Sequence, residues 1–253
     1  IEESPAPNLK ESLRDEMCTS ACRLAKSLEY RNAGTVEFIV SEKNQYYFLE
    51  MNTRLQVEHP VTELVCQLDL VEEQILIASR GRLSQSQSDI KQKGSAIESR
   101  VCCEDPINDF APVTGKIEKL YLPEIVNVRY DLGFSEGQKI TSDFDSMIGK
   151  LICYGSSRSD AIKKSIETIK KINILGVETN LNFLLAIFQS KAFSNGLLDT
   201  GFIANNNDLL KNLDLSDEMK DIVAILATLE DSDMLRLLAE TPDMHALIGR
   251  WRN

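Results

Sequence analysis

Apolar residues recur at helical spacing near the start of the chain, and this spacing predicts an amphipathic helix over residues 9–29. Asn8 stands three residues before Glu11, which is typical of a capping box at the start of a helix. Two β-rich runs follow, at 35–40 and 45–50, and the short polar stretch between them predicts a hairpin. The apolar positions of the helix are Leu9, Leu13, Met17, Ala21, Leu24 and Leu28.

The chain after the hairpin changes character and predicts a functional loop. Residues 51–63 are too polar for the interior of a strand and too rich in amide, charged and imidazole groups for an ordinary connection. Pro60 suits the first turn of a following helix. Asp69 is placed to cap a second apolar run, which Gly81 ends. Residues 82–94 are rich in Ser and Gln and are the best candidate for a linker.

A two-residue period begins at Ser95, where apolar Ile97 and Val101 alternate with charged side chains, and it predicts a small β-rich module. The tail, residues 206–253, holds ten acidic and five basic side chains, and its leucines predict two or three short amphipathic helices. Between these segments, further β-type runs occur at 116–122, 126–131 and 147–154, and helical runs at 160–172 and 180–188.

Composition places the chain among ordinary folded proteins. Its 253 residues are 43% hydrophobic and 26% charged, which excludes disorder and collagen. The 28 basic and 39 acidic side chains give a formal net charge of -11, which repels phosphate backbones. No apolar run approaches the roughly 20 residues of a membrane-spanning helix. We therefore expect neither nucleic acid nor a membrane as a partner.

The six cysteines lie mostly in apolar, periodic segments, and their spacing suggests neither a zinc site nor a redox pair. They are expected to be buried thiols of a protein in a reducing compartment. Cys18 and Cys22 are one helical turn apart and are expected to pack in the core. The first residues do not resemble a signal peptide, and the chain is expected to be cut out of something longer.

Two carboxylates of the predicted hairpin, Glu37 and Glu50, are expected to lie close enough to repel each other. Glu37 on the first strand and Glu50 at the end of the second are expected to lie opposite each other or one position apart. Like charges across a hairpin are destabilising, so either both are solvated or a hard cation such as magnesium lies between them. The side-chain carbonyl of Asn52 projects to the same side of an extended chain and could complete a cation site.

The two-residue step continues through Arg54, Gln56 and Glu58, so these side chains face one volume if the loop stays extended. The planar guanidinium of Arg54 suits a carboxylate, phosphate or bicarbonate. An acid beside an arginine near a bound anion, as Glu58 would be, is suited to act as a general base. A solvated polar edge is the alternative.

Longer motifs carry a resemblance to a known family, in the family's order along the chain. The first are Glu37-Phe-Ile-Val and Phe48-Leu-Glu-Met-Asn-Thr-Arg-Leu-Gln-Val-Glu-His-Pro-Val-Thr-Glu63. The others are Glu98-Ser-Arg-Val-Cys-Cys-Glu-Asp-Pro106, Asp145-Ser-Met-Ile-Gly-Lys-Leu-Ile152, Gly176-Val-Glu-Thr-Asn180 and Asp199-Thr-Gly-Phe202. Together they resemble the signature of biotin carboxylases, members of the ATP-grasp superfamily, over about residues 1–205.

The resemblance implies a reaction in two steps. ATP phosphorylates bicarbonate to carboxyphosphate, whose carbon dioxide is then taken by N1 of biotin attached to a carrier domain. Glu37 and Glu50 would hold the Mg²⁺ or Mn²⁺ ions that accompany ATP, with Asn52 in their coordination shell. The cofactors implied are therefore the metal, ATP and carrier-bound biotin.

The resemblance also assigns roles around the reacting groups. Arg54 would bind bicarbonate, and Gln56 with the backbone of Val57 would position that anion. Glu58 would be the base that deprotonates bicarbonate. Arg100 would contact biotin and stabilise its enolate-like form while the nitrogen attacks.

The fold implied is α+β. Residues 1–81 would form the carboxy-terminal portion of an ATP-grasp domain, followed by the linker at 82–94. Residues 95–205 would form the β-rich carboxy-terminal domain of a biotin carboxylase, and 206–253 an acidic helical tail. The two domains are expected to close on each other with Arg100 facing the functional loop.

The family's amino-terminal domain and mobile lid are expected to precede residue 1, because no glycine-rich phosphate motif occurs in this sequence. The chain is expected to be inactive alone, as part of a biotin-dependent carboxylase of the acyl-CoA or pyruvate type. Expected partners are the missing amino-terminal half, a biotin carboxyl carrier domain, a carboxyltransferase and further copies in a homo-oligomer, in the cytoplasm or the mitochondrial matrix. A catalytically silent fragment that serves as an assembly surface, or another ATP-grasp ligase, are the alternatives.

Three further side chains have open roles. His59 either relays protons or orients the loop through hydrogen bonds. Arg129 lies near a subunit contact, by the resemblance, or is a plain surface arginine. Lys150 is expected to pair with a carboxylate such as Asp145.

Overall fold

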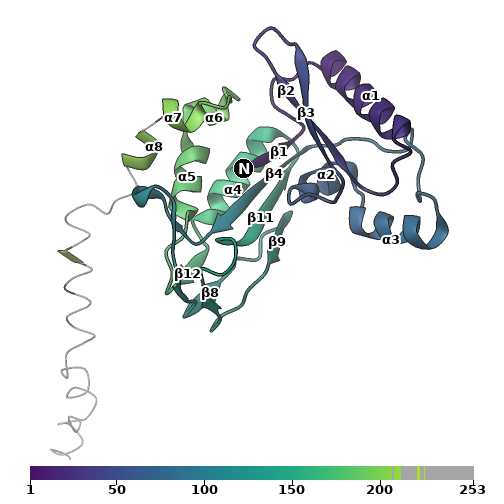
Figure 1. The fold of residues 1–253 in the computed structure, drawn as a ribbon. Coiled ribbons are helices and arrows are strands. Elements are labelled where there is room, and N and C mark those ends of the chain that lie inside the picture. Colours follow the sequence, from purple (N-terminus) through teal and green to yellow (C-terminus); the bar gives the residue numbers. More distant parts are fainter. Residues whose placement is uncertain (207, 212–220, 223–224, 226–253) are drawn as a thin grey trace, which may run out of the picture. The chain divides into compact units, whose positions relative to one another are not determined.

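The computed structural model describes residues 1–206, 208–211, 221, 222 and 225, and Figure 1 shows their arrangement. The chain divides into two compact units, Ile1–Leu210 and Lys211–Asn253. The first unit contains all the elements that position the candidate site. The helices predicted for the acidic tail from Leu226 onward lie outside the described residues.

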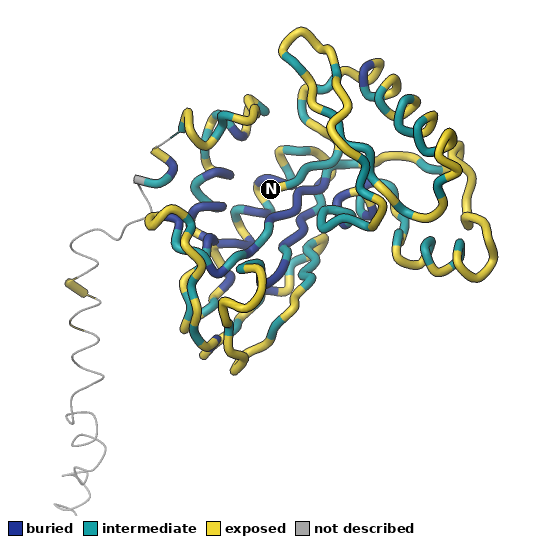
Figure 2. Tube along the Cα trace, viewed as in Figure 1, coloured by how far each residue is buried: buried dark blue, intermediate teal, exposed yellow. Residues whose placement is uncertain are grey.

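The predicted helix and hairpin of the first segment are confirmed. Helix α1 covers Glu11–Ser27, and strands β2 (Thr35–Val40) and β3 (Tyr46–Asn52) pair antiparallel. The turn between the strands closes with a hydrogen bond of 2.9 Å from the amide of Asn44 to the carbonyl of Ser41. The strand tips are largely exposed in this chain, as Figure 2 shows.

The capping box predicted at the start of α1 is wrong. The residue before the helix is Lys10, and no side chain caps the helix at this end. The amide of Asn8 instead donates to the carbonyls of Asn195 and Gly196, at 3.3 and 3.0 Å. A contact with a distant segment therefore takes the side chain that local sequence assigned to the cap.

The expectation that the cysteines are buried holds only in part. All six are free thiols, and Cys103 and Cys153 are buried, but Cys18 and Cys22 are exposed. The expectation for this pair is wrong because α1 packs through few residues, with Leu13 the residue of the helix that is buried. Helical spacing identified an apolar face without showing what covers it.

Two helices follow the functional loop, and their predicted ends are confirmed. Helix α2 covers His59–Cys66 and has Pro60 in its first turn. Helix α3 covers Leu70–Arg80, and the side chain of Asp69 accepts a hydrogen bond of 2.8 Å from a backbone amide of the first turn. Gly81 ends α3 with φ of 74°, a left-handed conformation that glycine adopts without strain.

A four-stranded antiparallel sheet forms the centre of the first unit (Figure 1). Its first strand comes from the beginning of the chain, so residues 2–4 join the sheet formed by residues 95–155. The order is β1-β4-β11-β9, with β1 at Glu2–Ser4, β4 at Ser95–Cys102, β9 at Val128–Leu132 and β11 at Met147–Gly155.

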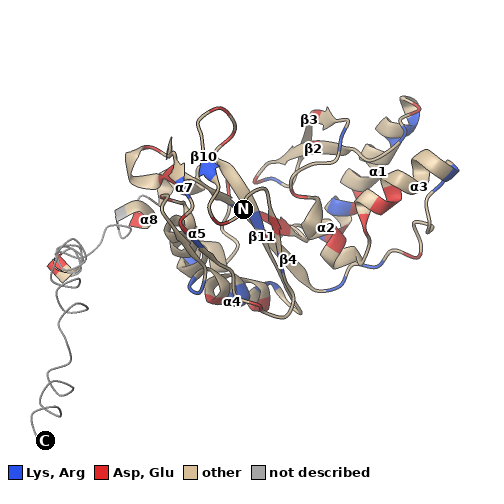
Figure 3. Cartoon of the chain, turned by 90° about the horizontal axis from the view of Figure 1, so that it is seen from below, with Lys and Arg blue, Asp and Glu red and all other residues tan. Residues whose placement is uncertain are grey.

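Helices cover both faces of this sheet. Helix α4 (Arg158–Ile169) packs on β11 and β4 and contacts α5 (Leu181–Gln189). Helix α2 packs on β4, β11 and β1, and Figure 3 shows acidic and basic positions gathered where it meets these strands. The apolar part of the α2 contact consists of Val61, Val65, Ala96 and Ile152.

Shorter elements complete the second half of the first unit. Three pairs of short strands, β5 with β6, β7 with β10 and β8 with β12, lie outside the central sheet. No helix among the described residues is long and apolar enough to cross a membrane. The bounds are Glu104–Asp105 (β5), Pro106–Asn108 (a 3₁₀ turn), Ala111–Pro112 (β6), Gly115–Lys116 (β7), Lys119–Tyr121 (β8), Lys139–Ile140 (β10), Asn173–Leu175 (β12), Lys191–Ser194 (α6), Phe202–Asn205 (α7) and Asp208–Lys211 (α8).

Substitution at Val65 tests the contact that holds α2 on the sheet. Val65 is fully buried, so Val65→Ala removes two methyl groups from a packed contact and should lower the free energy of unfolding by about 2 kcal/mol. Val71→Ala is the control, because Val71 lies in α3 and is 44% exposed. Chemical denaturation of both variants measures the difference. Equal losses would contradict the packing described for α2.

Candidate active site

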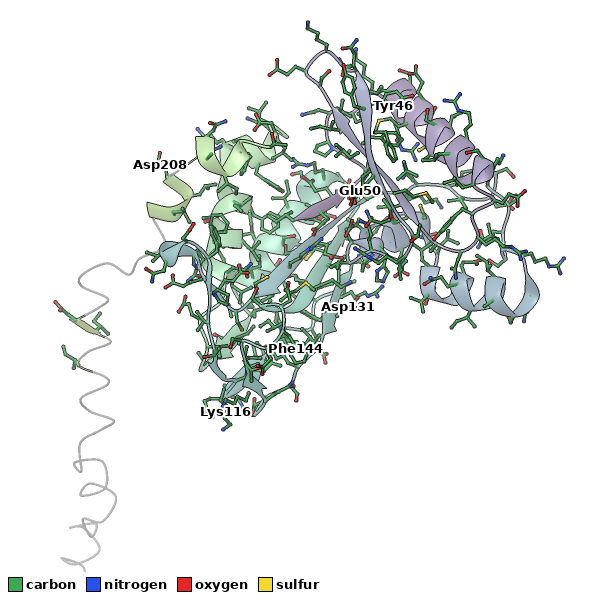
Figure 4. All side chains as sticks on the ribbon, in the orientation of Figure 1. Tyr46, Glu50, Lys116, Asp131, Phe144 and Asp208 are labelled. Atoms are coloured by element: carbon green, nitrogen blue, oxygen red, sulfur yellow. The ribbon has the colours of Figure 1, made fainter. Side chains whose placement is uncertain are left out.

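The two hairpin carboxylates lie directly opposite each other, as expected. Glu37 and Glu50 are partners in the register of β2 and β3, and Figure 4 places Glu50 at the end of the hairpin that is next to the central sheet. The amide nitrogen of Asn52 donates to both carboxylates, at 2.8 Å to Glu37 and 3.0 Å to Glu50. Gln56 donates to the same oxygen of Glu37 at 2.7 Å. Neutral amide donors therefore offset the repulsion between the two acids.

This group of side chains is suited to one particular kind of metal. Among the described residues, no cluster of three or more His, Cys, Asp or Glu side chains could hold an ion by itself. Glu37, Glu50 and Asn52 offer two carboxylates and one amide oxygen. Magnesium is commonly bound by one or two carboxylates together with phosphate oxygens and water. The residues present therefore fit a magnesium ion that arrives with a phosphate ligand.

The functional loop borders a pocket of about 710 Å³, whose wall includes Arg54, Gln56, Glu58 and Glu2. The loop does not stay extended throughout its length. It turns at Val57 and Glu58, and Glu58 becomes the residue that precedes α2. Arg54, Gln56 and Glu58 therefore line one pocket, as predicted. Glu50 and Asn52 lie beside Glu37 of the hairpin instead.

His59 has contacts that orient the loop. Its Nδ1 is 2.8 Å from the carbonyl oxygen of Gln56, and its Nε2 is 4.0 Å from a carboxylate oxygen of Glu63. Both contacts lie within the loop and the first turns of α2. The orienting role, of the two left open by the sequence, is the one that these contacts support.

Arg100 faces the loop, as expected from the sequence. Its side chain projects from β4, and its Nη2 donates to Glu58 across 3.3 Å. Its Nε is 2.8 Å from a carboxylate oxygen of Glu2 of β1, in an ion pair that lacks hydrogen-bond geometry. The arginine is therefore held between a carboxylate of the loop and a carboxylate of the sheet.

Lys150 connects the sheet to the backbone of the loop. It lies opposite Arg100 on one side and Asp131 on the other in the register of the sheet. Its ammonium donates to the carbonyl of Val57 at 2.7 Å and is 3.5 Å from Asp131 and 4.0 Å from Glu98. With only 11% of its side chain exposed, Lys150 fixes the peptide between the predicted anion-binding residues and the predicted base.

The predicted pairing of Lys150 with Asp145 is wrong. Asp145 precedes β11, and its carboxylate accepts a hydrogen bond of 2.8 Å from the amide of Met147 instead. Acids from two neighbouring strands, Asp131 and Glu98, take its place because strand register brings them beside the lysine.

Glu98 is a fully buried acid beneath the site. Its carboxylate has no hydrogen-bond partner among the described residues. Burial raises the pKa of Glu98 to about 8, although the charge of Lys150 acts in the opposite direction. Two-residue alternation had placed this side chain on a polar face, but the loop and α2 cover that face, and β1 pairs with the strand at its edge.

Arg129 links the outer strand of the sheet to α2. It bonds Asp131 at 2.7 and 2.9 Å and Glu63 of α2 at 2.7 Å. Burial acts to raise the pKa of Asp131, but the hydrogen bonds and charge of Arg129, together with Lys150, lower it. Figure 4 shows Asp131 on the side of the sheet nearest α2. Arg129 is thus more than a plain surface arginine in this chain.

Sequence reasoning missed Glu2, Glu98 and Asp131 as neighbours of the site. Glu98 stands two residues before Arg100, a spacing that places both on one face of a strand, so this signal was present. Glu2 and Asp131 carried no comparable signal. Their places follow from strand pairings that no local pattern specifies.

Comparison with known proteins agrees with this geometry. Residues 1–86 match the family model described as carbamoyl-phosphate synthase L chain, ATP binding domain, and residues 98–205 match that of the biotin carboxylase C-terminal domain. The chain belongs to the biotin carboxylase family. It corresponds to the carboxy-terminal part of a biotin carboxylase, and the α+β fold expected from the resemblance is confirmed.

Two relatives and one solved structure illustrate the match. Biotin carboxylase 2 of Bacillus subtilis is 43% identical over 80% of this chain and 46% of its own length. The alpha chain of mitochondrial methylcrotonoyl-CoA carboxylase from Glycine max is 41% identical over 87% of this chain and 30% of its own length. The biotin carboxylase domain dimer of Hydrogenobacter thermophilus 2-oxoglutarate carboxylase, solved with MgADP, ADP and bicarbonate, has a TM-score of 0.81 and 37% identity, covering 85% of this chain and 47% of that one. The chain thus spans half or less of these biotin carboxylase proteins.

The buried acid Glu98 predicts a pH dependence of stability. Its pKa is about 8 when folded and about 4.5 in the unfolded chain, so the folded protein retains a proton that the unfolded chain loses in this range. This contribution to stability is complete below pH 4.5 and is lost as pH rises through 8. Glu98→Gln, which stays neutral, should therefore melt at a higher temperature than the wild type at pH 9 but not at pH 5.

Thermal unfolding between pH 5 and pH 9 measures this difference. Glu167→Gln is the control, because Glu167 is exposed and a hydrogen bond from Lys171 lowers its pKa. That variant should show no gain at high pH. A melting temperature of Glu98→Gln that runs parallel to the wild type across the range would contradict a raised pKa at Glu98.

Proposed function

We propose that this chain forms the part of a biotin carboxylase that holds the metal, bicarbonate and biotin during ATP-dependent carboxylation of biotin. The proposal is supported by family membership and by the joining of two groups of side chains. Gln56 connects the hairpin carboxylates to the loop, and Glu58 connects the loop to Arg100. The contact of 3.3 Å between Glu58 and Arg100 is the observation that carries the proposal, because it joins the residue proposed as the base to the residue proposed to bind biotin.

The first step needs a bound anion and a base. Glu37, Glu50 and Asn52 would hold magnesium, which supplies positive charge to the phosphate groups of ATP. Asn52 would turn its amide to present oxygen to the ion. Arg54 would bind bicarbonate, with Gln56 and the backbone of Val57 positioning it.

Glu58 would take the proton of bicarbonate as its oxygen attacks the γ-phosphorus of ATP. The bond from that phosphorus to ADP breaks, and ADP leaves with the bonding electrons. The product, carboxyphosphate, then breaks down into carbon dioxide and phosphate. A carboxylate that lines the same pocket as Arg54 suits this task, because a base must lie within reach of the proton that it takes.

The second step uses Arg100. N1 of biotin gives its proton to the phosphate released with carbon dioxide and attacks the carbon dioxide, and negative charge develops on the ureido oxygen of biotin as the proton leaves. The guanidinium of Arg100 would stabilise this charge through hydrogen bonds that strengthen as the charge develops. Its side chain is 41% exposed and therefore accessible to a carrier-bound ligand.

Two alternatives remain to be separated by experiment. Another ATP-grasp ligase is disfavoured by the match of residues 98–205 to the biotin carboxylase C-terminal domain. A catalytically silent fragment that serves as an assembly surface would keep the fold without turnover. The ion pair between Glu58 and Arg100 favours the enzyme, since assembly alone requires no base at this place.

We extend the proposal to partners and compartment from the names of the relatives. These proteins include subunits of carboxylases and a biotin carboxylase domain dimer, which supports a carrier domain, a carboxyltransferase and a second copy as partners. A mitochondrial relative and bacterial relatives support the mitochondrial matrix or the cytosol. We also propose that an amino-terminal half supplies the remaining ATP contacts.

Release of ADP tests the function. The complete enzyme, in which this chain is accompanied by the amino-terminal half of a biotin carboxylase, should release ADP in the presence of MgATP and biotin. The rate should rise with bicarbonate. A coupled ADP assay measures both dependences. ADP release that does not depend on bicarbonate or biotin would favour another ATP-grasp ligase. The absence of ADP release would favour a silent fragment.

Two substitutions in the same enzyme separate the base from the metal ligands. Glu58→Gln keeps shape but removes basicity, so it should lower turnover by about 10² to 10⁴ and leave the affinity for MgATP nearly unchanged. Glu50→Gln removes an anionic ligand and should instead weaken MgATP binding. Steady-state kinetics and titration with MgATP measure the two effects. The same defect in both variants would mean that the residues from Glu50 to Glu58 form one metal site.

A further inference from the structure

Arg100 is held by two carboxylates at different nitrogens. Glu58 accepts from Nη2 at 3.3 Å, and Oε1 of Glu2 is 2.8 Å from Nε. Glu2 belongs to the wall of the pocket that the functional loop borders, and only 21% of its side chain is exposed. The guanidinium thus meets a carboxylate of the sheet at Nε and a carboxylate of the loop at Nη2.

The position of Glu2 follows from strand pairing. In the register of β1 and β4, Glu2 lies opposite Glu98, which is two residues before Arg100 on the same face of β4. A residue diagonal to another across an antiparallel pair is within reach of a long side chain. Glu2 can therefore contact the arginine while its backbone stays in the sheet.

The next residue anchors the strand. Glu3 points to the other face of β1 and bonds Arg158 of α4 at 2.6 and 2.9 Å. Arg158 also donates to the carbonyls of Phe193 and Ser194, at 2.8 and 2.9 Å. These contacts fix the backbone of the strand, and so they fix the origin of the Glu2 side chain.

We propose that Glu2 is a positioning residue for Arg100, whose carboxylate attracts the guanidinium at Nε and so keeps Nη2 directed toward the loop. The proposal rests on the proposed function and adds a residue to it. Its physical reason lies in the reaction itself. When Glu58 takes a proton, it loses its charge and its attraction for the arginine weakens, whereas the contact of Glu2 with Nε does not involve that proton.

The neighbouring acid does not compete for this role. Glu98 is opposite Glu2 and fully buried, and its nearest cation is Lys150 at 4.0 Å. Burial favours its neutral form. Glu2 is therefore the carboxylate that keeps Arg100 in place between the two steps of the reaction.

Glu2→Gln in the complete enzyme tests the proposal. The variant keeps shape and removes the charge, so the guanidinium loses its anchor. The rate of biotin carboxylation should fall about 10-fold to 100-fold, as expected when a group that contacts the reacting atoms is displaced by about 1 Å. Bicarbonate-dependent ATP cleavage without biotin and the KM for MgATP should stay within about 2-fold, because neither requires Arg100.

Glu3→Gln is the matched control. It removes a glutamate–arginine ion pair from the adjacent residue of the same strand, on the opposite face, and this pair is bidentate and hydrogen-bonded. It should lower thermal stability at least as much as Glu2→Gln and leave the ratio of biotin carboxylation to ATP cleavage unchanged. Glu2→Asp, which keeps the charge but shortens the side chain, should fall between the wild type and Glu2→Gln.

A double substitution separates positioning from an independent effect. In the Arg100→Ala background, Glu2→Gln should cause no further loss, because the residue through which it acts is gone. A loss that persists in this background, an equal change in Glu3→Gln, or an unchanged ratio in Glu2→Gln would each overturn the proposal.

The same assays distinguish failure of the proposed function from failure of the positioning role of Glu2. Failure of the proposed function would appear as a wild-type enzyme without biotin-dependent ADP release, or as an Arg100→Ala variant with full activity. An active wild type, an impaired Arg100→Ala and a normal Glu2→Gln would overturn the positioning role alone.

Discussion

The site depends on the largely buried ammonium group of Lys150, because this group joins three parts of the fold at one point. It donates to the carbonyl of Val57 in the loop and lies beside Asp131 of β9 and Glu98 of β4. A buried cation is stable only with its partners in place, since an unpaired one costs several kcal/mol. The loop therefore has the geometry of the sheet imposed on it. Gln56, on one side of Val57, then donates to Glu37 of the hairpin. Glu58, on the other side, accepts from Arg100 of β4.

The register of β4 with β11 determines both which side chains are buried in the core and which side chains meet at the site. Along one face of β4, apolar Ala96 is followed by Glu98 and Arg100, and the partners on β11 run from Tyr154 to Lys150 in step. Helix α2 covers the apolar end of this face, and the loop meets its charged end. A slip of one residue would turn the charged side chains toward α4 and the apolar ones toward the loop. A register that buries the core correctly is thus the same register that assembles the charges.

Local pattern was sufficient for elements whose physics is local. The hairpin, its opposed acids Glu37 and Glu50, and the cap at Asp69 depend on residues that are close in sequence, and all were predicted. The pairing of β1 with β4 was not, because three residues rich in glutamate have no strand pattern and gain their place only from a distant partner. The same cause explains why the cap expected of Asn8 was wrong. The family motifs supplied the candidate site, and the roles of its residues remain predictions.

The hairpin carboxylates show how one set of side chains can serve two conditions. Without a cation, two acids opposite each other would repel, but Asn52 places one amide nitrogen within 3.0 Å of both. An amide carries a donor and an acceptor on the same group, so a half turn exchanges the hydrogen bonds for an oxygen ligand. Aspartate in this position would add a third negative charge, and leucine would remove the amide donor of Glu50 and leave Glu37 with that of Gln56 alone. Asparagine at this position therefore suits the cation site that we propose, and Gln56 is a second amide donor to Glu37.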